Sequence, residues 1–419
     1  MARSRLLALW SVCAVALASP VSGQDLDRIW GRVFTASGEE HEGFLRWGRD
    51  QGSWVDVLEG TKSIPRENYM AWLDAIDGEL ALRTIELRGH RISWEEEHPD
   101  FPLTARSGIR FGHLASLEVF GPDRVELGLR SGQTVELEGR GVGLRPGLGR
   151  LILDVPGERE RRFLSLEIQR VAFSAVPPGA RAAARRLHGT VEDELGRLFT
   201  GYVAWDLDEI LESDLLEGEE SVGGRDRAVP FRDIGSISRT PGGARVTLMN
   251  GDELELTGTN DVDEDNRGIR IADPALGLVE VEWEQFRTLR LHPPRAPVTY
   301  DAFDGGHLLR GTVTTRAGEE IDGVIRWDAD QANSWEFLEG RGGDALFTIE
   351  MSHVSRIERG ETFGARVTLV DGRSFELGES NDLDLDNKGI MVAPEGADFS
   401  DPSAWRMVTW DDFREIGFR

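Results

Sequence analysis

The sequence predicts an all-β protein made of three tandem β-rich modules, each of two related halves. Three observations lead to this prediction. One spacing of glycines and a tryptophan recurs three times along the 419 residues, and such a period indicates one folding unit used repeatedly. Apolar and polar residues alternate over short runs bounded by turn residues, which is typical of half-buried strands. No long segment of the sequence shows a convincing helical period.

The repeated spacing is the same at four positions in each module. A glycine is followed by a second glycine twelve residues on, by a tryptophan four residues further, and by a third glycine thirteen residues beyond that. These residues are Gly31, Gly43, Trp47 and Gly60; Gly189, Gly201, Trp205 and Gly218; and Gly311, Gly323, Trp327 and Gly340. Because the tryptophans keep register with structural glycines, we expect them in the core rather than on a sugar-binding surface. Trp54 and Trp335 lie outside this register, and we expect them to be more exposed.

An N-terminal export signal and two proline pairs define the segment boundaries. Arg3 and Arg5 precede an apolar run too short to span a bilayer, which predicts a signal peptide cleaved after Gly23 or, alternatively, after Ala18. The proline pairs at 177–178 and 293–294 cannot continue a strand or a helix, so they mark linkers. The predicted segments are a signal peptide at 1–23, a first module at 29–174 with an insert at about 61–107, a linker at 175–186, a second module at 187–291, a Pro-rich linker at 292–306 and a third module at 307–419.

Each module shows the same succession of elements twice. A strand, a glycine turn, a second strand, a loop and a further strand are followed by apolar residues three apart, which suits one turn of 3₁₀ or α-helix leading into a short strand. These apolar triplets are Phe111, Leu114 and Leu117; Phe231, Ile234 and Ile237; Trp283, Phe286 and Leu289; Met351, Val354 and Ile357; and Trp410, Phe413 and Ile416. Asn250-Gly251 and Asp371-Gly372 lie between alternating runs and predict tight hairpin turns.

A half-module of about fifty residues, with four or five short strands and one helical turn, resembles the small barrels of the SH3-like and Sm-like type. The resemblance rests on strand count and rhythm, and it implies one barrel per half. The alternative is that both halves close together into one β-sandwich. Because chains this short bury little surface, we expect the paired halves to share one core.

Charge and cysteine content argue against several classes of function. The formal net charge is −27; such a surface repels phosphate groups, so neither nucleic acid nor anionic lipid is expected as a partner. Cys13, the only cysteine, lies in the signal segment, so the mature chain would have no disulfide, catalytic thiol or Cys-ligated metal. We expect no membrane span after signal cleavage, because no later apolar run is long enough. The motifs of serine hydrolases, zinc proteases and P-loop or dinucleotide-binding enzymes do not occur.

Two acidic loops provide the candidate metal ligands. Alternating carboxylates followed by an asparagine can turn several oxygens toward one hard cation. The candidate ligands are Asp261, Asp263, Asp265 and Asn266 in the second module and Asp382, Asp384, Asp386 and Asn387 in the third. The pattern resembles the first half of an EF-hand loop, but Ala272 and Ala393 stand where that loop needs a bidentate glutamate. We expect weak Ca²⁺ binding or, alternatively, turns in which Asp and Asn bond their own backbone. The first-module loop at 140–147 has no acidic residue.

The sequence therefore favours a secreted or periplasmic, non-enzymatic protein with a binding or scaffold role at the cell envelope. Its expected partner is an unidentified protein or polysaccharide of that envelope. No cofactor is firmly indicated, and Ca²⁺ is the candidate. The alternative is a carbohydrate-binding protein or a degenerate glycosidase that uses tryptophans and carboxylates. That alternative requires exposed tryptophans in a groove beside carboxylates. A purely structural spacer is the third hypothesis.

Overall fold

The computed structural model describes residues 25–65, 68, 103–121, 124–139, 150–221, 223–361 and 364–419. These residues form antiparallel strands that belong to three sheets and are joined by loops and 3₁₀ turns. The prediction of an all-β protein is thereby confirmed. The predicted signal peptide at 1–23, the acid-free loop at 140–147 and most of the predicted insert at 61–107 lie outside the described residues.

The described strands and turns fall into three successive groups. The first is β1 (Trp30–Thr35), β2 (Glu40–Trp47), β3 (Val57–Ser63), β4 (Thr104–Arg110), η1 (Phe111–His113), β5 (Leu114–Val119), β6 (Arg124–Leu129), β7 (Thr134–Glu138), β8 (Arg150–Asp154), β9 (Arg161–Leu164), η2 (Ser165–Glu167) and β10 (Ile168–Phe173). The second is β11 (His188–Asp193), β12 (Leu198–Ala204), β13 (Leu215–Glu220), β14 (Asp226–Pro230), η3 (Phe231–Asp233), β15 (Ile234–Thr240), β16 (Gly243–Leu248), β17 (Glu253–Thr257), β18 (Ile269–Asp273), β19 (Gly277–Val281), η4 (Trp283–Gln285) and β20 (Phe286–Leu291). The third is η5 (Tyr300–Ala302), β21 (Arg310–Thr315), β22 (Glu320–Arg326), β23 (Phe337–Gly342), β24 (Ala345–Glu350), η6 (Met351–His353), β25 (Val354–Arg359), β26 (Ala365–Leu369), β27 (Ser374–Leu377), β28 (Ile390–Ala393), η7 (Pro402–Ala404), β29 (Arg406–Val408) and β30 (Phe413–Phe418).

The strand order follows one pattern in the three groups. The first sheet runs β4-β3-β7-β6-β5-β10-β1-β2-β8-β9, and the second begins β14-β13-β17-β16-β15-β20-β11-β12-β18-β19, which is the same order with ten added to each number. The third sheet runs β27-β26-β25-β30-β21-β22-β28-β29, and an isolated bridge joins Arg341 of β23 to Gly378, the residue that follows β27. The 3₁₀ turns η1, η3, η4 and η6 begin at the first residues of four predicted apolar triplets.

The two sequence halves of a module are interleaved in space. In the first module, β3 of the first half pairs with β7 of the second half, while β8 of the second half pairs with β2 of the first. The ten-stranded sheet can be divided into two five-stranded parts, β4-β3-β7-β6-β5 and β10-β1-β2-β8-β9. Each five-stranded part contains strands from both sequence halves, so the halves pack as one unit. Over the described residues the sheets end in edge strands and do not close on themselves. The finer expectation of one small barrel per half is thus not confirmed by the strand pairing.

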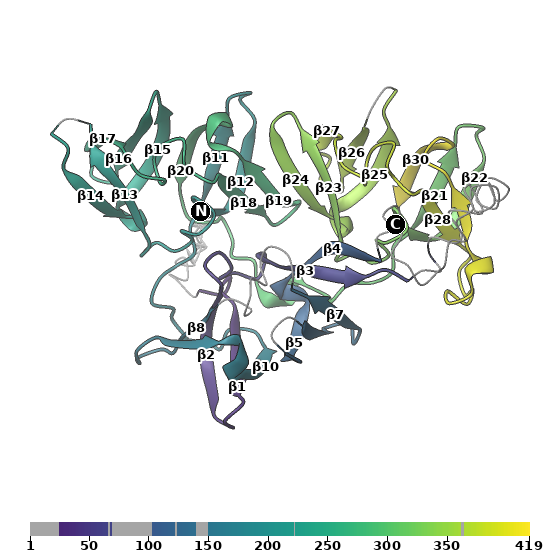
Figure 1. Cartoon of the computed structure of the whole chain (residues 1–419), viewed down its shortest axis with the longest axis horizontal. Coiled ribbons are helices and arrows are strands. Elements are labelled where there is room, and N and C mark those ends of the chain that lie inside the picture. Colours follow the sequence, from purple (N-terminus) through teal and green to yellow (C-terminus); the bar gives the residue numbers. More distant parts are fainter. Residues whose placement is uncertain are drawn as a thin grey trace, which may run out of the picture.

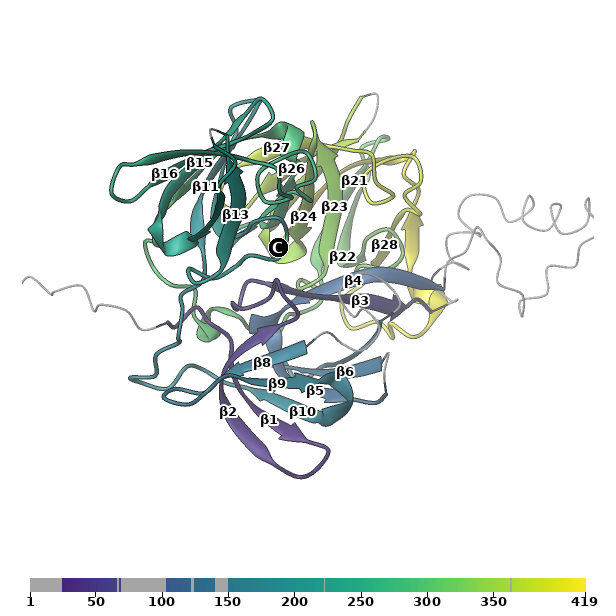
Figure 2. The ribbon, with the colours of Figure 1, turned by 60° about the vertical axis from the view of Figure 1, so that its left-hand side comes forward.

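The second and third modules also share strands. The edge strand β19 pairs antiparallel with β24, with Val279 opposite Phe347, so β24 and β23 complete the second sheet. Figures 1 and 2 show these two modules side by side, with the first module lying across their lower ends. One continuous hydrophobic core runs from Leu187 in the second module to Ile416 in the third.

The repeated glycines lie opposite one another on neighbouring strands. Gly189 faces Gly201, and a Cβ on Gly201 would lie only 2.3 Å from the carbonyl oxygen of Ala272. The equivalent pairs in the other modules are equally crowded. The repeated tryptophans Trp47, Trp205 and Trp327 are at most 1% exposed, which confirms that they belong to the core.

The prediction that Trp54 and Trp335 are more exposed is wrong, because they are 0% and 2% exposed. Both lie where modules meet. The Trp54 ring is 4.6 Å from the ring of Tyr300 in the second linker, and Trp335 packs with the core of the first module.

The Pro-rich linker at 292–306 packs on the first module rather than acting as a free spacer. Tyr300 donates from its hydroxyl group to the carbonyl oxygen of Leu114 at 2.7 Å. Phe303 packs so closely on Gly112 that a Cβ there would lie 2.1 Å from the Phe303 ring. In the first module, β3 and β4 remain paired as far as Ser63 and Thr104. The predicted insert at about 61–107 therefore begins and ends on strand residues.

Candidate functional site

A tight turn at the end of β12 holds the candidate site. The backbone N–H of Trp205 donates to the carbonyl oxygen of Glu209, and the N–H of Asp208 donates to that of Trp205. Asp206 and Leu207 have φ values of +47° and +60°. Left-handed backbone at residues other than glycine is uncommon and is frequent at functional sites.

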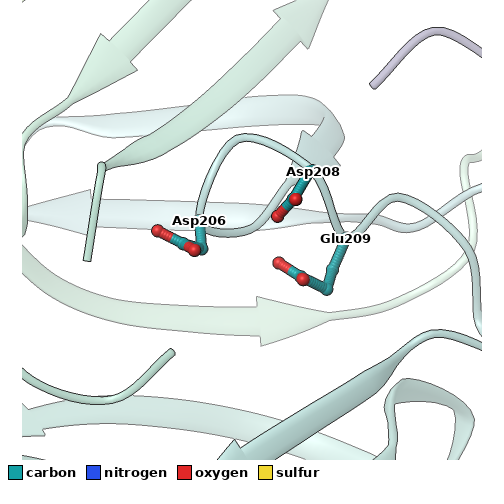
Figure 3. A group of neighbouring side chains, drawn as sticks. All are labelled: Asp206, Asp208 and Glu209. Carbon is teal, nitrogen blue, oxygen red and sulfur yellow. The ribbon is translucent and has the colours of Figure 1, made fainter. Parts of the chain in front are cut away.

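Three carboxylates of this turn, Asp206, Asp208 and Glu209, form what we call the acidic centre. One oxygen of each lies within 4.8 Å of the others, and Figure 3 shows the three side chains on one turn, with those of Asp208 and Glu209 next to each other. Asp206 and Asp208 are buried and Glu209 is half-buried. Among the described residues, this is the group of His, Asp and Glu side chains close enough together to hold a metal ion.

Two arginines neutralise most of the acidic centre. Arg267 donates to Asp206 Oδ2 at 2.6 Å and to Asp208 Oδ1 at 2.5 Å. Arg49, which comes from the first module, donates to Asp208 Oδ2 at 2.7 Å. Glu209 Oε2 is buried and has no hydrogen-bond partner within the described chain. The charge of Glu209 is therefore the least compensated of the three.

These environments move the pKa values of neighbouring carboxyl groups apart. Burial, and then the charges of Asp208 and Asp261, raise the pKa of Glu209 to about 9. Burial alone would raise the pKa of Asp208, but hydrogen bonds with Arg49 and Glu209 and the charge of Arg267 lower it below its usual value. At neutral pH the Glu209 carboxyl is therefore protonated while Asp208 is ionised, so a cation that binds here must displace a proton.

One carboxylate of each predicted acidic loop, that of Asp261 or Asp382, is buried and stabilises the fold. Asp261 Oδ2 accepts from the backbone N–H of Glu217 at 2.6 Å, and its carbonyl oxygen accepts from Trp205 Nε1 at 2.8 Å. Asp382 makes the same bonds with Glu339 and Trp327. Burial, and then the charge of Asp206, raise the pKa of Asp261 to about 6.

The other predicted ligands bond within their own loops. The carboxylate of Asp263 accepts from the N–H of Asp265, and Asp384 accepts likewise from Asp386. The side chains of Asn266 and Asn387 bond the loop backbone. Asp265 and Asp386 are exposed. In the described residues, the predicted ligands of each loop do not form a cluster of three carboxylates close enough for a metal ion.

The third module has a related turn with a different charge balance. Asp328 and Asp330 correspond to Asp206 and Asp208, while Gln331 stands at the position of Glu209. Burial, opposed by Lys388 and reinforced by Asp330, raises the pKa of Asp328 to about 7. Gln331 Nε2 donates to Asp382 Oδ1 at 3.0 Å, so an amide replaces the third carboxyl group.

None of the three carboxylates of the acidic centre is among the ligands predicted from the sequence, although the predicted ligand Asp261 lies close to Glu209. The visible signal is the acidic residue that directly follows the repeated tryptophan, at Asp206 and again at Asp328. What the sequence does not show is that Glu209, three residues later, turns back beside Asp208.

Comparison of the chain with known protein families, with curated proteins and with solved structures found no match. Within the described ranges, no helix is long and apolar enough to cross a membrane.

Proposed function

We propose that the chain is a secreted or periplasmic, non-enzymatic protein with a binding or scaffold role at the cell envelope, in which the three modules are held in one fixed arrangement. The observation that carries this proposal is a buried ion pair where all three modules meet. Arg110 at the end of β4 and Glu350 at the end of β24 are 1% and 2% exposed, and Arg110 Nε lies 3.1 Å from Glu350 Oε2.

The second module closes this contact. Arg110 donates to the carbonyl oxygen of Asp273, the last residue of β18, at 2.8 Å, and to that of Pro274 at 3.1 Å. A buried charge that loses its partner is strongly destabilising, so this contact favours one relative position of the modules. A rigid, strongly acidic body suits a scaffold that presents a surface to a partner.

A further buried ion pair links the first module to the segment just before the second. Arg186 Nη2 lies 3.0 Å from Asp56 Oδ1, and both side chains are at most 5% exposed. Asp56 also accepts from the N–H groups of Gly52 and Ser53 at 2.7 Å. Because the same carboxylate stabilises a turn of the first module and binds an arginine beside the second, local folding and module packing depend on each other.

We also infer that each five-stranded part is a variant of the SH3-like or Sm-like barrel. Five short strands and one 3₁₀ turn in each part support the resemblance. The exchange of strands between sequence halves explains why neither half would form such a barrel alone.

Fractionation of cells that produce the full-length, C-terminally tagged chain tests the proposed location and role. We expect the protein in the envelope or periplasmic fraction with residues 1–23 removed, as N-terminal sequencing would show. We also expect the purified mature chain to co-sediment with isolated envelope polysaccharide or with an envelope protein. An uncleaved chain in the cytosol would contradict the proposed location, and a mature chain that co-sediments with neither would contradict the binding role.

Divalent-cation binding at the acidic centre is a second candidate function. Three ligand oxygens within 4.8 Å and the unpartnered Glu209 Oε2 favour it, whereas Arg267 competes for two of the carboxylates. Ca²⁺ prefers six to eight oxygen ligands, so binding would be weak and would require water molecules as additional ligands.

Calorimetric titration with Ca²⁺ separates the acidic centre from the predicted loops. If the acidic centre binds, Glu209→Gln abolishes the heat and the rise in melting temperature, while a double variant Asp263→Asn and Asp265→Asn retains both. The opposite pattern would assign binding to the loop of the second module. No heat with the unmodified protein at millimolar Ca²⁺ would refute both sites.

The carbohydrate-binding alternative is left without its main support. The repeated tryptophans Trp205 and Trp327 are 0% exposed, so neither offers a ring face to a sugar. Their indole N–H groups already donate to the carbonyl oxygens of Asp261 and Asp382.

A further inference from the structure

A pocket between the first and third modules is the strongest feature outside the acidic centre. It has a volume of about 330 Å³ and is lined by β3, β7 and the loop before β23. The charged and aromatic residues of its lining are Lys62, Glu136, Glu138, Asp330, Trp335 and Glu336. Its walls come from two modules, so their packing creates it.

The single lysine of this lining is already fully engaged. Lys62 Nζ donates to the carbonyl oxygen of Asp330 at 2.7 Å, forms an ion pair with Glu336 and lies 3.4 Å from Asp330 Oδ2. An ammonium group has three donors, so Lys62 has none left for Glu136 or Glu138. No described residue forms an ion pair with either glutamate, which alternate along β7 and are exposed. The pocket therefore carries an excess of negative charge.

Two buried polar atoms of the lining also lack partners. Asp330 Oδ1 and Trp335 Nε1 have no hydrogen-bond partner within the described residues. The Asp330 side chain is 7% exposed and Trp335 is 2% exposed. An unsatisfied buried polar group is costly and calls for an explanation such as a ligand. Here one group needs a donor and the other an acceptor. Burial, only partly offset by Lys62, raises the pKa of Asp330 to about 6.

We propose that this pocket binds a ligand bearing an ammonium group with a neighbouring hydrogen-bond acceptor. The ammonium group would lie between Asp330 and the β7 glutamates, and a small shift of the side chains would bring Asp330 Oδ1 and Trp335 Nε1 into contact with the ligand. A bare metal ion fits less well, because the carboxylates of the pocket do not form a close group of three, unlike those of the acidic centre. A neutral polyol would leave the excess charge uncompensated. This proposal does not depend on cation binding at the acidic centre.

The ammonium group could belong to a free amine or to a lysine side chain of a partner protein. Both present the same chemistry to Asp330 and Glu138. The test therefore uses ethanolamine and putrescine as free amines, N-acetyl-lysinamide as the side-chain source, erythritol as a neutral compound of similar size, and Mg²⁺ as an inorganic cation.

Calorimetric titration of the mature chain at physiological salt, which screens weak surface binding, measures each probe. We expect saturable binding of the amines and none of erythritol. Asp330→Asn should weaken amine binding about tenfold or more, because it removes a buried charged acceptor. Glu138→Gln should weaken it about threefold, as for an exposed charge pair. Asp411→Asn removes one exposed charge that is not part of the pocket lining and should leave binding unchanged.

The relative affinities of the probes distinguish the two sources of the ammonium group. Tighter binding of N-acetyl-lysinamide than of the free amines would assign the site to a protein side chain, and the reverse would assign it to a free amine. If Asp330→Asn does not melt cooperatively, the variant Glu138→Gln decides, because Glu138 is an exposed residue. The proposal is overturned if no amine binds saturably, if both pocket variants bind amines as the unmodified chain does, or if erythritol or Mg²⁺ binds as tightly and with the same dependence on Glu138.

Discussion

Glu209 is a single residue whose surroundings change its ordinary chemistry. Asp208 and Asp261 lie close to it, and no described group donates to its buried Oε2. Holding a proton is the simplest way to avoid an unpaired buried charge. The neighbouring Asp208 stays ionised because Arg49 and Arg267 bind it. Two adjacent carboxyl groups thus have different protonation states at neutral pH.

Glu209 gives a pH dependence whose sign is fixed by its raised pKa. Between the usual value of 4.5 and the folded value of about 9, the native state holds a proton that the unfolded state has lost. Stability due to this group therefore falls as pH rises through that range. Glu209→Gln should remove this part of the decline, so we expect the variant to melt above the unmodified chain near pH 9 and close to it near pH 4.5. Thermal unfolding across pH checks this, and an unchanged pH profile would contradict the assigned protonation state.

The paired glycines of neighbouring strands are a second case in which single residues determine the local structure. Replacing Gly201 with alanine would place a Cβ 2.3 Å from the carbonyl oxygen of Ala272. Because a backbone atom cannot move as freely as a side chain, we expect a loss of about 1–3 kcal/mol, typical of overpacking. Gly417→Ala, a strand position with nothing within 4 Å of its Cβ, is the matched control. Urea unfolding of both variants measures the difference, and equal stability would show that the strands can separate to admit a methyl group.

At the scale of elements, the pairing of β19 with β24 joins two modules into one sheet. Gly277 begins β19 with φ +147°, and a Cβ there would lie 2.0 Å from the carbonyl oxygen of Thr348. The edge strands elsewhere are poor templates for further pairing: β29 has three residues, β14 ends at Pro230 and β9 carries two arginines. Short, charged or proline-containing edges resist association.

Gly277→Val should open the joint between β19 and β24 without unfolding the second module. We expect faster hydrogen exchange at the amides of β24 and β19, and unchanged protection in β15 and β16. Gly242→Val, which imposes a similar positive-φ strain in a turn with nothing within 4 Å, should leave β24 protected. Exchange measured by mass spectrometry distinguishes the two, and full protection of β24 in Gly277→Val would show that the joint is not held by this pairing.

The strand pattern and the framework residues could be predicted from the sequence, but the pairing between distant strands could not. The spacing of glycine and tryptophan correctly indicated buried tryptophans, and Asn250-Gly251 and Asp371-Gly372 lie in the loops that join β16 to β17 and β26 to β27. Alternation of apolar residues shows that a strand has a buried face and not which strand lies beside it. The pairing of β3 with β7 and of β8 with β2, across the two sequence halves, could therefore not be predicted.

The candidate site was harder to predict for a related reason. The alternating acidic residues of the loops predict that their carboxylates face one common cation. Instead, Asp261 points inward and accepts from the backbone N–H of Glu217, while Asp265 is exposed. Arg49 and Glu209, which decide the charge of the acidic centre, come from different modules and carry no motif. Likewise the burial of Trp335 depends on a neighbouring module, which the sequence around Trp335 does not show.

At the scale of the whole molecule, Arg110 and Glu350 connect parts of the chain that are far apart in sequence. Burial alone would raise the pKa of Glu350, but Arg110 and then His113 outweigh it and lower the pKa to about 2. A lowered carboxyl pKa contributes stability above the unfolded value of 4.5 that is lost as pH falls toward 2. The sign is opposite to that of Glu209, so stability should be greatest in mildly acidic solution.

Glu350→Gln removes one partner of a fully buried pair and leaves Arg110 without its carboxylate. We expect a loss of about 3–5 kcal/mol, which is the usual effect of such a change. Glu415→Gln, which removes the partner of the half-exposed Arg356, is the control and should change stability little. Denaturant unfolding at neutral pH measures both. A loss no larger than that of the control would mean that the buried pair does not hold the modules together.

Differential scanning calorimetry of the purified protein tests the proposal that the three modules form one fixed body. We expect a single cooperative transition for the unmodified protein, with a calorimetric enthalpy equal to the van't Hoff enthalpy. We also expect Glu350→Gln to separate the first module into a transition of its own at lower temperature. Two or three resolved transitions in the unmodified protein would contradict the proposal, because they would show that the modules unfold independently.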